Sequence, residues 1–223
     1  MPLNPSKPIL YLITRGATTE ATTPDAPEFA HILNQVSAAV ANGIDLIQIR
    51  EKRLTAHVLF QLASQAAKLT SGSGTRLLVN DRADIAVSAG ADGVHLTTQS
   101  LDTAIIRKTF DRKFLIGVST HLVDEVVAAR DHGADFAVFG PVFETESKLQ
   151  FGFPKGLEEL SRVVRAVAEF PVLALGGVSL ANAAECLAAG ARGIAGITLF
   201  DRRENFTDLR AKLSGRQRDE KQI

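Results

Sequence analysis

The stretch Asn42-Gly43-Ile44-Asp45-Leu46-Ile47-Gln48-Ile49 places a glycine between an alanine-rich segment and a short, mostly apolar run. The same arrangement recurs at three further phrases: Ala89-Gly90-Ala91-Asp92, His132-Gly133-Ala134-Asp135 and Ala189-Gly190-Ala191-Arg192. Glycine has no Cβ, so it adopts at little cost the left-handed conformation that ends many helices. Each phrase therefore predicts the end of a helix followed directly by a strand.

The strands predicted after these glycines are nearly continuous apolar runs, as at 46–49, 136–139 and 194–197. Strands that are apolar on both sides are typical of parallel sheets covered on both faces. The same reading along the chain predicts eight strands, near residues 9–14, 44–49, 76–80, 93–96, 114–119, 136–140, 172–176 and 193–197. Helical patterns separate them, for example at 55–69, 122–131, 157–168 and 180–189.

Eight strands alternating with helices favour an α/β fold of one kind, a closed (βα)8 TIM barrel. An open doubly wound sheet is the alternative. We see no linker that would mark a second domain, so we expect a single barrel domain over residues 1–223 with flexible ends at about 1–8 and 214–223. The segment 144–155 is long for a barrel loop, which favours a functional role.

The composition excludes several classes of partner. Because 25 basic residues balance 25 acidic ones, the chain lacks the positive excess of a nucleic-acid-binding surface. It also lacks an apolar run long enough for a membrane span and an N-terminal signal core. The one cysteine, Cys186, fits a reducing cytoplasm and is expected to be a small buried side chain rather than a nucleophile. We expect a cytoplasmic protein without nucleic-acid or membrane partners, and a homo-oligomer is open.

Polar residues follow the predicted strands at their carboxyl ends, where the chemistry of this fold is found. In a barrel these residues converge on one rim. In chain order they are Gln48, Arg50, Glu51 and Lys52; Asn80, Asp81 and Arg82; His95; Ser119, Thr120 and His121; Thr145, Ser147 and Lys148; Gly176 and Gly177; and Thr198.

Two anion-binding regions are expected on this rim. Gly176-Gly177 predicts the start of a helix whose N-terminal amides would bind a phosphate after the seventh strand, although a tight turn is the competing interpretation. Arg50, Lys52 and Lys148 suit a second phosphate or a diphosphate, although Lys52 could instead form a surface salt bridge.

Three further side chains have two interpretations each. Asp81, beside Asn80, is a candidate ligand of Mg²⁺ or else the N-cap of the helix expected from Ala83. His95 and His121 lie near strand ends, where they are candidates for proton transfer or else neutral hydrogen-bonded histidines.

Six separate runs resemble signatures of the thiamine phosphate synthase family, in order, over roughly residues 10–200. They are Gln48-Ile49-Arg50-Glu51-Lys52, Val79-Asn80-Asp81-Arg82, Asp92-Gly93-Val94-His95-Leu96, Gly117-Val118-Ser119-Thr120-His121, Phe139-Gly140-Pro141-Val142-Phe143 and Leu175-Gly176-Gly177-Val178. The resemblance implies an enzyme of thiamine biosynthesis, a transferase that joins hydroxymethylpyrimidine diphosphate to thiazole phosphate and releases pyrophosphate.

The resemblance also implies roles for individual residues. It assigns Mg²⁺ to Asp81, and charge stabilisation on the leaving diphosphate to Arg50 and Lys148. It assigns the pyrimidine diphosphate to Gln48, Arg50, Glu51, Lys52, Asn80, Ser119 and Lys148. It assigns the thiazole phosphate to Thr145, Ser147, Gly177, Ile197 and Thr198.

One departure from the family pattern keeps a second reaction open. The family has a second magnesium-binding aspartate where this chain has Ser100, so metal affinity is expected to fall. A sister group, the thiazole tautomerases, also lacks that aspartate and moves a proton with a histidine that matches His121. The alternatives to the synthase are therefore a tautomerase acting on thiazole carboxylate phosphate and a non-catalytic protein that binds thiazole phosphate or thiamine phosphate.

Overall fold

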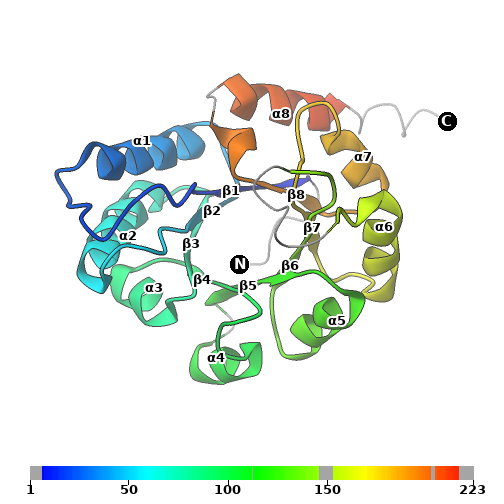
Figure 1. Cartoon of the computed structure of the whole chain (residues 1–223), viewed down its shortest axis with the longest axis horizontal. Helices are drawn as coiled ribbons and strands as arrows, with labels where there is room; N and C mark the ends of the chain where they lie inside the picture. The colour runs from blue at the N-terminus through cyan, green and yellow to red at the C-terminus, as the bar shows by residue number, and fades with distance from the viewer. Residues whose placement is uncertain (1–6, 112, 146–152, 202–203, 216–223) are drawn as a thin grey trace.

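The computed structural model describes residues 7–111, 113–145, 153–201 and 204–215, and it contains one closed barrel of eight parallel strands (Figure 1). The strands pair in chain order and β8 pairs with β1, so the closed barrel is confirmed and the open sheet is excluded. They are β1 (Ile9–Ile13), β2 (Leu46–Ile49), β3 (Arg76–Asn80), β4 (Gly93–Leu96), β5 (Leu115–Thr120), β6 (Phe136–Phe139), β7 (Val172–Ala174) and β8 (Gly193–Gly196).

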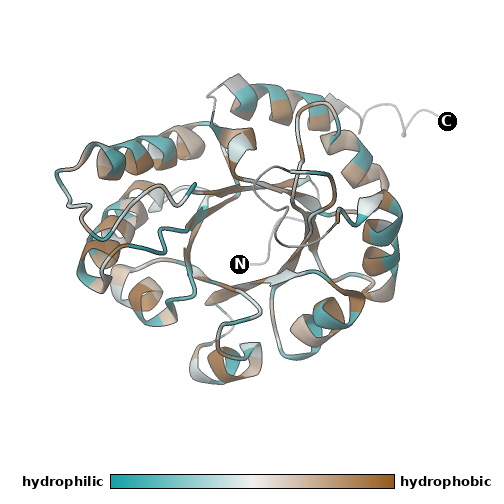
Figure 2. Ribbon diagram, in the orientation of Figure 1, coloured by the Kyte–Doolittle hydropathy of each residue, from teal (hydrophilic) through white to brown (hydrophobic). Residues whose placement is uncertain are grey.

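Helices follow the strands and surround the barrel (Figure 1). They are α1 (Pro27–Ala41), α2 (Ala56–Thr70), α3 (Ala83–Ala89), α4 (Thr103–Thr109), α5 (Val123–Asp131), α6 (Gly156–Ala166), α7 (Ala183–Ala188), the 3-10 helix η2 (Thr198–Phe200) and α8 (Glu204–Gly215). Hydrophobic residues are concentrated on the strands, and the helices carry hydrophilic residues among hydrophobic ones (Figure 2).

The glycine phrases act as expected. Gly43, Gly90, Gly133 and Gly190 all have positive φ, between 65° and 98°, and each lies between a helix and the next strand. After Gly43 the chain turns back at once, because the amide of Ile44 donates to the carbonyl of Ala39 inside α1. This short turn explains why so many helix–strand junctions could be placed from the sequence.

Side chains alternate along each strand between two cores. On β1, Leu10 and Leu12 pack in the cluster between the barrel and its helices, whereas Ile9, Tyr11 and Ile13 belong to the cluster inside the barrel. This interior also contains the buried polar side chains of Gln48 and His95, which lie on the path to the rim.

Three other expectations can be compared with the structure. Cys186 is buried, and this burial raises its pKa to about 11, as suits a packing residue rather than a nucleophile. Among the described residues, no helix is both long and apolar enough to cross a membrane. Most of the ends expected to be flexible, 1–8 and 214–223, lie outside the described residues.

Candidate active site

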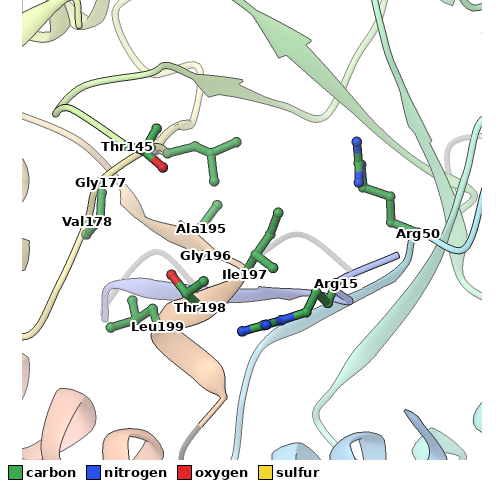
Figure 3. A pocket seen from close by; sticks show the side chains of 12 residues that line it. Arg15, Arg50, Thr145, Gly177, Val178, Ala195, Gly196, Ile197, Thr198 and Leu199 are labelled. Atoms are coloured by element: carbon green, nitrogen blue, oxygen red, sulfur yellow. The ribbon is translucent and has the colours of Figure 1, made fainter. Parts of the chain in front are cut away.

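A cavity of about 340 Å³ opens at the carboxyl ends of the strands. Arg15 and Arg50 lie on one side of it, and Thr145 and Gly177 lie on the other (Figure 3). The lining residues come from segments far apart in the sequence: Arg15, Arg50, Thr145, Leu175, Gly176, Gly177, Val178, Ala195, Gly196, Ile197, Thr198 and Leu199. The barrel therefore brings together the four residues expected at a phosphate and described here, Thr145, Gly177, Ile197 and Thr198.

Gly176 and Gly177 line the cavity with backbone atoms alone. Both have positive φ, 95° and 63°, which L side chains rarely adopt. A Cβ at Gly176 would lie 2.6 Å from the Cα of Pro141, and one at Gly177 would lie 2.7 Å from the Cβ of Phe143. The loop after β6 thus packs directly on the loop after β7, and only glycine leaves the necessary space.

The helix expected at 180–189, opened by Gly176-Gly177, is shorter than predicted, since α7 begins only at Ala183 and Gly176-Gly177 do not form its N-terminus. The side chain of Asn182 accepts a hydrogen bond from the amide of Ser179 and donates to the carbonyl of Gly177, and this bridge holds a turn instead. A helix end does reach the cavity, but it is that of η2, which begins at Thr198 directly after β8. Loops after strands seven and eight, with a short extra helix, commonly bind phosphate in these barrels.

Two arginines bring positive charge to the cavity. Arg50 follows β2, and its amide donates to the hydroxyl of Thr14 at 2.8 Å. Arg15 follows β1 and forms an ion pair with Asp201, just beyond η2. Sequence reasoning missed Arg15, although the signal was present: it follows a strand end as Arg50 does.

A chain of hydrogen-bonded side chains lies inside the barrel beneath the rim. Nε2 of Gln48 lies 2.9 Å from the hydroxyl of Tyr11, which lies 3.1 Å from Nδ1 of His95, and Nε2 of His95 lies 2.9 Å from Oγ of Ser119. Burial, followed by the charge of Arg50, lowers the pKa of His95 to about 3. His95 is therefore a neutral, hydrogen-bonded histidine, the second of the two interpretations drawn from the sequence.

The residues after β3 and β2 form a polar group beside this chain. Asp81 has a φ of 63°, unusual for a residue with a side chain, and the buried Oδ1 atom of Asn80 has no hydrogen-bond partner among the described residues. Loss of hydration and the charge of Arg50 lower the pKa of Lys52, whereas Asp81 raises it, so these charges act on one another. Asp81 is not the N-cap of α3, because Arg82 occupies that position and no side chain caps the helix.

The family profile described as thiamine monophosphate synthase matches residues 10–200 of the chain. The chain belongs to this family. It is 45% identical over 193 residues to a protein of Geobacter sulfurreducens that is provisionally named a thiamine-phosphate synthase, which covers 85% of this chain and 90% of that relative. It is 37% identical over 217 residues to the thiamine-phosphate synthase of Methanocella arvoryzae, covering 93% and 98%.

A solved structure of the same family has the same fold. The thiamine phosphate pyrophosphorylase of Pyrococcus furiosus superposes with a TM-score of 0.77 at 28% sequence identity, covering 93% of this chain and 96% of that one.

Ser100 occupies the position at which the resemblance implies a second magnesium-binding aspartate. Its hydroxyl accepts a hydrogen bond from the amide of Thr97 at 2.8 Å and lies 3.1 Å from the Thr97 hydroxyl, so it serves its own loop. Within the ranges that the structure covers, no group of three or more His, Cys, Asp or Glu residues could hold a metal ion. Of the two aspartates that the resemblance implies, this chain has Asp81 and carries Ser100 at the second position.

The remaining expected residues differ in their placement. Glu51 is buried, and its carboxylate accepts hydrogen bonds from the amides of Gly16 and Thr18 and from the Thr18 hydroxyl at 3.0, 3.2 and 2.7 Å. It holds the loop after β1. Ser147 and Lys148 lie outside the described residues.

His121 has a fixed ring. Nδ1 lies 2.5 Å from the carbonyl oxygen of Gly140, to which it must donate, so Nε2 carries the lone pair if the ring is neutral. The amide of His121 donates to Glu125 at 2.6 Å. His121 is not among the residues that line the cavity.

Proposed function

We propose that this chain is a thiamine-phosphate diphosphorylase-type transferase, which joins hydroxymethylpyrimidine diphosphate to thiazole phosphate and releases pyrophosphate. The observation that carries the proposal is the cavity in which the backbone of Gly177 lies across from the side chains of Arg15 and Arg50 (Figure 3). A reaction between two phosphorylated substrates needs two anion subsites on one rim, and membership of the family supports this assignment.

The thiazole phosphate is proposed to bind between the loops after β6, β7 and β8. Thr145, Gly177, Ile197 and Thr198 would surround it, with Ser147 as a further ligand. Main-chain amides at Gly177 and at the start of η2, together with the Thr198 hydroxyl, are suitable donors to phosphate oxygens.

The pyrimidine diphosphate is proposed to bind beside it, over the ends of β2, β3 and β5. Its contacts would be Gln48, Arg50, Lys52, Asn80, Ser119 and Lys148, with Glu51 holding the neighbouring loop. As the diphosphate leaves, negative charge develops on its oxygens, and Arg50 and Lys148 would stabilise that charge. The thiazole nitrogen would then capture the pyrimidine cation, which requires the two substrates to be held side by side on the rim.

A magnesium ion is part of the proposal. The buried Oδ1 of Asn80, which has no partner in the part of the chain that the structure describes, and the adjacent carboxylate of Asp81 are hard oxygen ligands of the kind that Mg²⁺ takes. Protein sites often provide Mg²⁺ with only one or two carboxylates and leave the rest to substrate phosphates and water. The ion would neutralise charge on the leaving diphosphate.

The test is a paired assay of the purified chain with both substrates, with and without Mg²⁺. The proposal expects thiamine phosphate to form and its rate to rise with Mg²⁺. The absence of product at every Mg²⁺ concentration would reject it. Arg50→Gln is the matched variant, and it should lower kcat by about 100-fold, since it removes a charge from the leaving group.

His121 supports a second candidate, a thiazole tautomerase. Its Nδ1 is engaged by Gly140, so Nε2 is left to exchange a proton, and the loss of the second aspartate at Ser100 matters little to a metal-free isomerisation. This candidate expects isomerisation of thiazole carboxylate phosphate without Mg²⁺, and full activity in His121→Ala would contradict it.

Binding of thiazole phosphate without turnover in either assay would instead support the non-catalytic alternative. A cytoplasmic location and a homo-oligomer remain predictions.

A further inference from the structure

The buried chain of hydrogen bonds beneath the rim joins four strands of the barrel. Tyr11 on β1, Gln48 on β2 and His95 on β4 are almost completely buried, and Ser119 on β5 is half-buried at the upper end. Gly117 leaves the space that the ring of His95 occupies, because a Cβ there would lie 2.7 Å from its Nδ1. The rings of Tyr11 and Phe136 pack edge to face at 5.5 Å, so the geometry is held from several sides.

The direction of these hydrogen bonds follows from counting donors. The amide Nε2 of Gln48 can only donate, so the hydroxyl oxygen of Tyr11 accepts from it. Among the described residues, Nδ1 of His95 is the other group bonded to this hydroxyl, so the buried hydroxyl proton has an acceptor only if it points to His95. Nδ1 of His95 must then accept, and in a neutral ring the proton is carried by Nε2. Nε2 therefore donates to Oγ of Ser119.

The direction of the hydrogen bond between His95 and Ser119 determines whether the Ser119 hydroxyl can donate to a ligand. Its oxygen already accepts from His95, so its own proton is free to point towards the rim. The opposite direction would use that proton on His95 and leave only lone pairs for a ligand at the rim. Diphosphate oxygens and unprotonated pyrimidine nitrogens are acceptors, and they need a donor.

We propose that Tyr11 and His95 are positioning residues that fix the hydroxyl of Ser119 as a hydrogen-bond donor to an acceptor atom of the pyrimidine diphosphate. The identity of the substrate rests on the proposed function, whereas the direction of the hydrogen bonds rests on their geometry and on the burial of a neutral His95 ring. The two parts can therefore fail separately.

The first measurement is the tautomer of His95, by long-range ¹H–¹⁵N correlation NMR of the full-length chain without substrate. The signals of His95 are identified by their loss in His95→Gln. The proposal expects an unprotonated Nδ1 and a protonated Nε2. A protonated Nδ1 would overturn it, whether or not the chain makes thiamine phosphate.

The second measurement uses Tyr11→Phe, which removes the hydroxyl and keeps the ring. Without this donor, Nδ1 of His95 loses its partner, so the tautomer should no longer be uniform. We expect kcat/KM for the pyrimidine diphosphate to fall about tenfold, the usual scale of one hydrogen bond, with KM for thiazole phosphate unchanged. Phe136→Leu is the packing control: it changes a neighbouring ring without touching the hydrogen bonds, so the tautomer should be retained.

The decisive comparison combines Tyr11→Phe with Ser119→Ala. If Tyr11 acts through Ser119, its hydroxyl has nothing left to orient in the Ser119→Ala background, and removing it there should change kcat/KM less than twofold. An equal tenfold loss in both backgrounds would assign Tyr11 a merely structural role and reject the proposal. An unchanged His95 tautomer in Tyr11→Phe would reject it as well.

Discussion

Gly177 packs against Phe143 so closely that a Cβ on the glycine would lie 2.7 Å from the Cβ of the phenylalanine. The two residues belong to the loops after β7 and β6, and the cavity proposed for thiazole phosphate is lined by Gly177 and by Thr145, two residues beyond Phe143. The position of one loop therefore depends on the absence of a side chain in the other.

Gly177→Ala should consequently raise KM for thiazole phosphate by about tenfold or more, because the two loops must separate. It should also lower the free energy of unfolding by about 1–3 kcal/mol, since alanine is strained at a φ of 63°. Steady-state kinetics and urea unfolding measure the two effects.

Gly90→Ala is the matched control. Gly90 has a φ of 74°, but nothing lies within 4 Å of an added Cβ, and it belongs to the helix–strand turn after α3. It should lose a similar amount of stability with both KM values unchanged. A rise in KM for thiazole phosphate in this control would show that the effect at Gly177 arises from general instability.

Arg15 is expected to contribute to phosphate binding. Arg15→Gln should raise KM for thiazole phosphate by about tenfold, the scale of one charge-assisted hydrogen bond, with little change in kcat. Its ion pair with Asp201 is at the surface, so stability should fall by less than about 1 kcal/mol. Arg162→Gln, which breaks an exposed ion pair with Glu159 on α6, is the control and should leave both KM values unchanged. Equal KM values in Arg15→Gln and the unmutated chain would remove Arg15 from the site.

The fold could be predicted from the sequence, whereas some of the contacts at the site could not. The barrel could be predicted because each helix–strand junction is a local event: a glycine such as Gly43 ends a helix and an apolar run follows. The role of Tyr11 could not, since its side chain looks like any apolar strand residue and its partners, Gln48 and His95, are 37 and 84 positions away. The start of α7 was misplaced because the bridge from Asn182 to Gly177 depends on a side-chain geometry that has no local signal.

Ser100→Asp tests the missing metal ligand. A second carboxylate should tighten Mg²⁺ binding by about tenfold in the absence of substrate, because the charge of the ligand set largely determines the affinity for a hard cation. Isothermal titration with MgCl₂ measures this directly, independently of turnover. Asp81→Asn is the opposite variant and should weaken binding; if both variants bind Mg²⁺ as the unmutated chain does, the ion is not held at this position.

Glu51 is expected to stabilise a loop. Glu51→Gln keeps the shape of the side chain but loses the charge that accepts from Gly16 and Thr18, so the free energy of unfolding should fall by about 1–3 kcal/mol. Glu20→Gln, on the same loop but exposed, should change it by less than about 0.5 kcal/mol. Urea unfolding of the two variants measures the difference, and equal stabilities would mean that the carboxylate does not anchor the loop.

The neutral ring of His95 makes stability depend on pH. Its pKa is about 3 in the folded chain and about 6.5 when unfolded, so between these values the unfolded state binds a proton that the folded state does not. Its contribution is therefore fully present above pH 6.5 and is lost as the pH falls towards 3, by about 1.4 kcal/mol per pH unit at most. His95→Gln should flatten the dependence between pH 6.5 and 4.5, measured by urea unfolding at each pH. His57→Gln, at an exposed position on α2, should leave the slope unchanged, and an equally steep slope in His95→Gln would show that other groups cause the acid sensitivity.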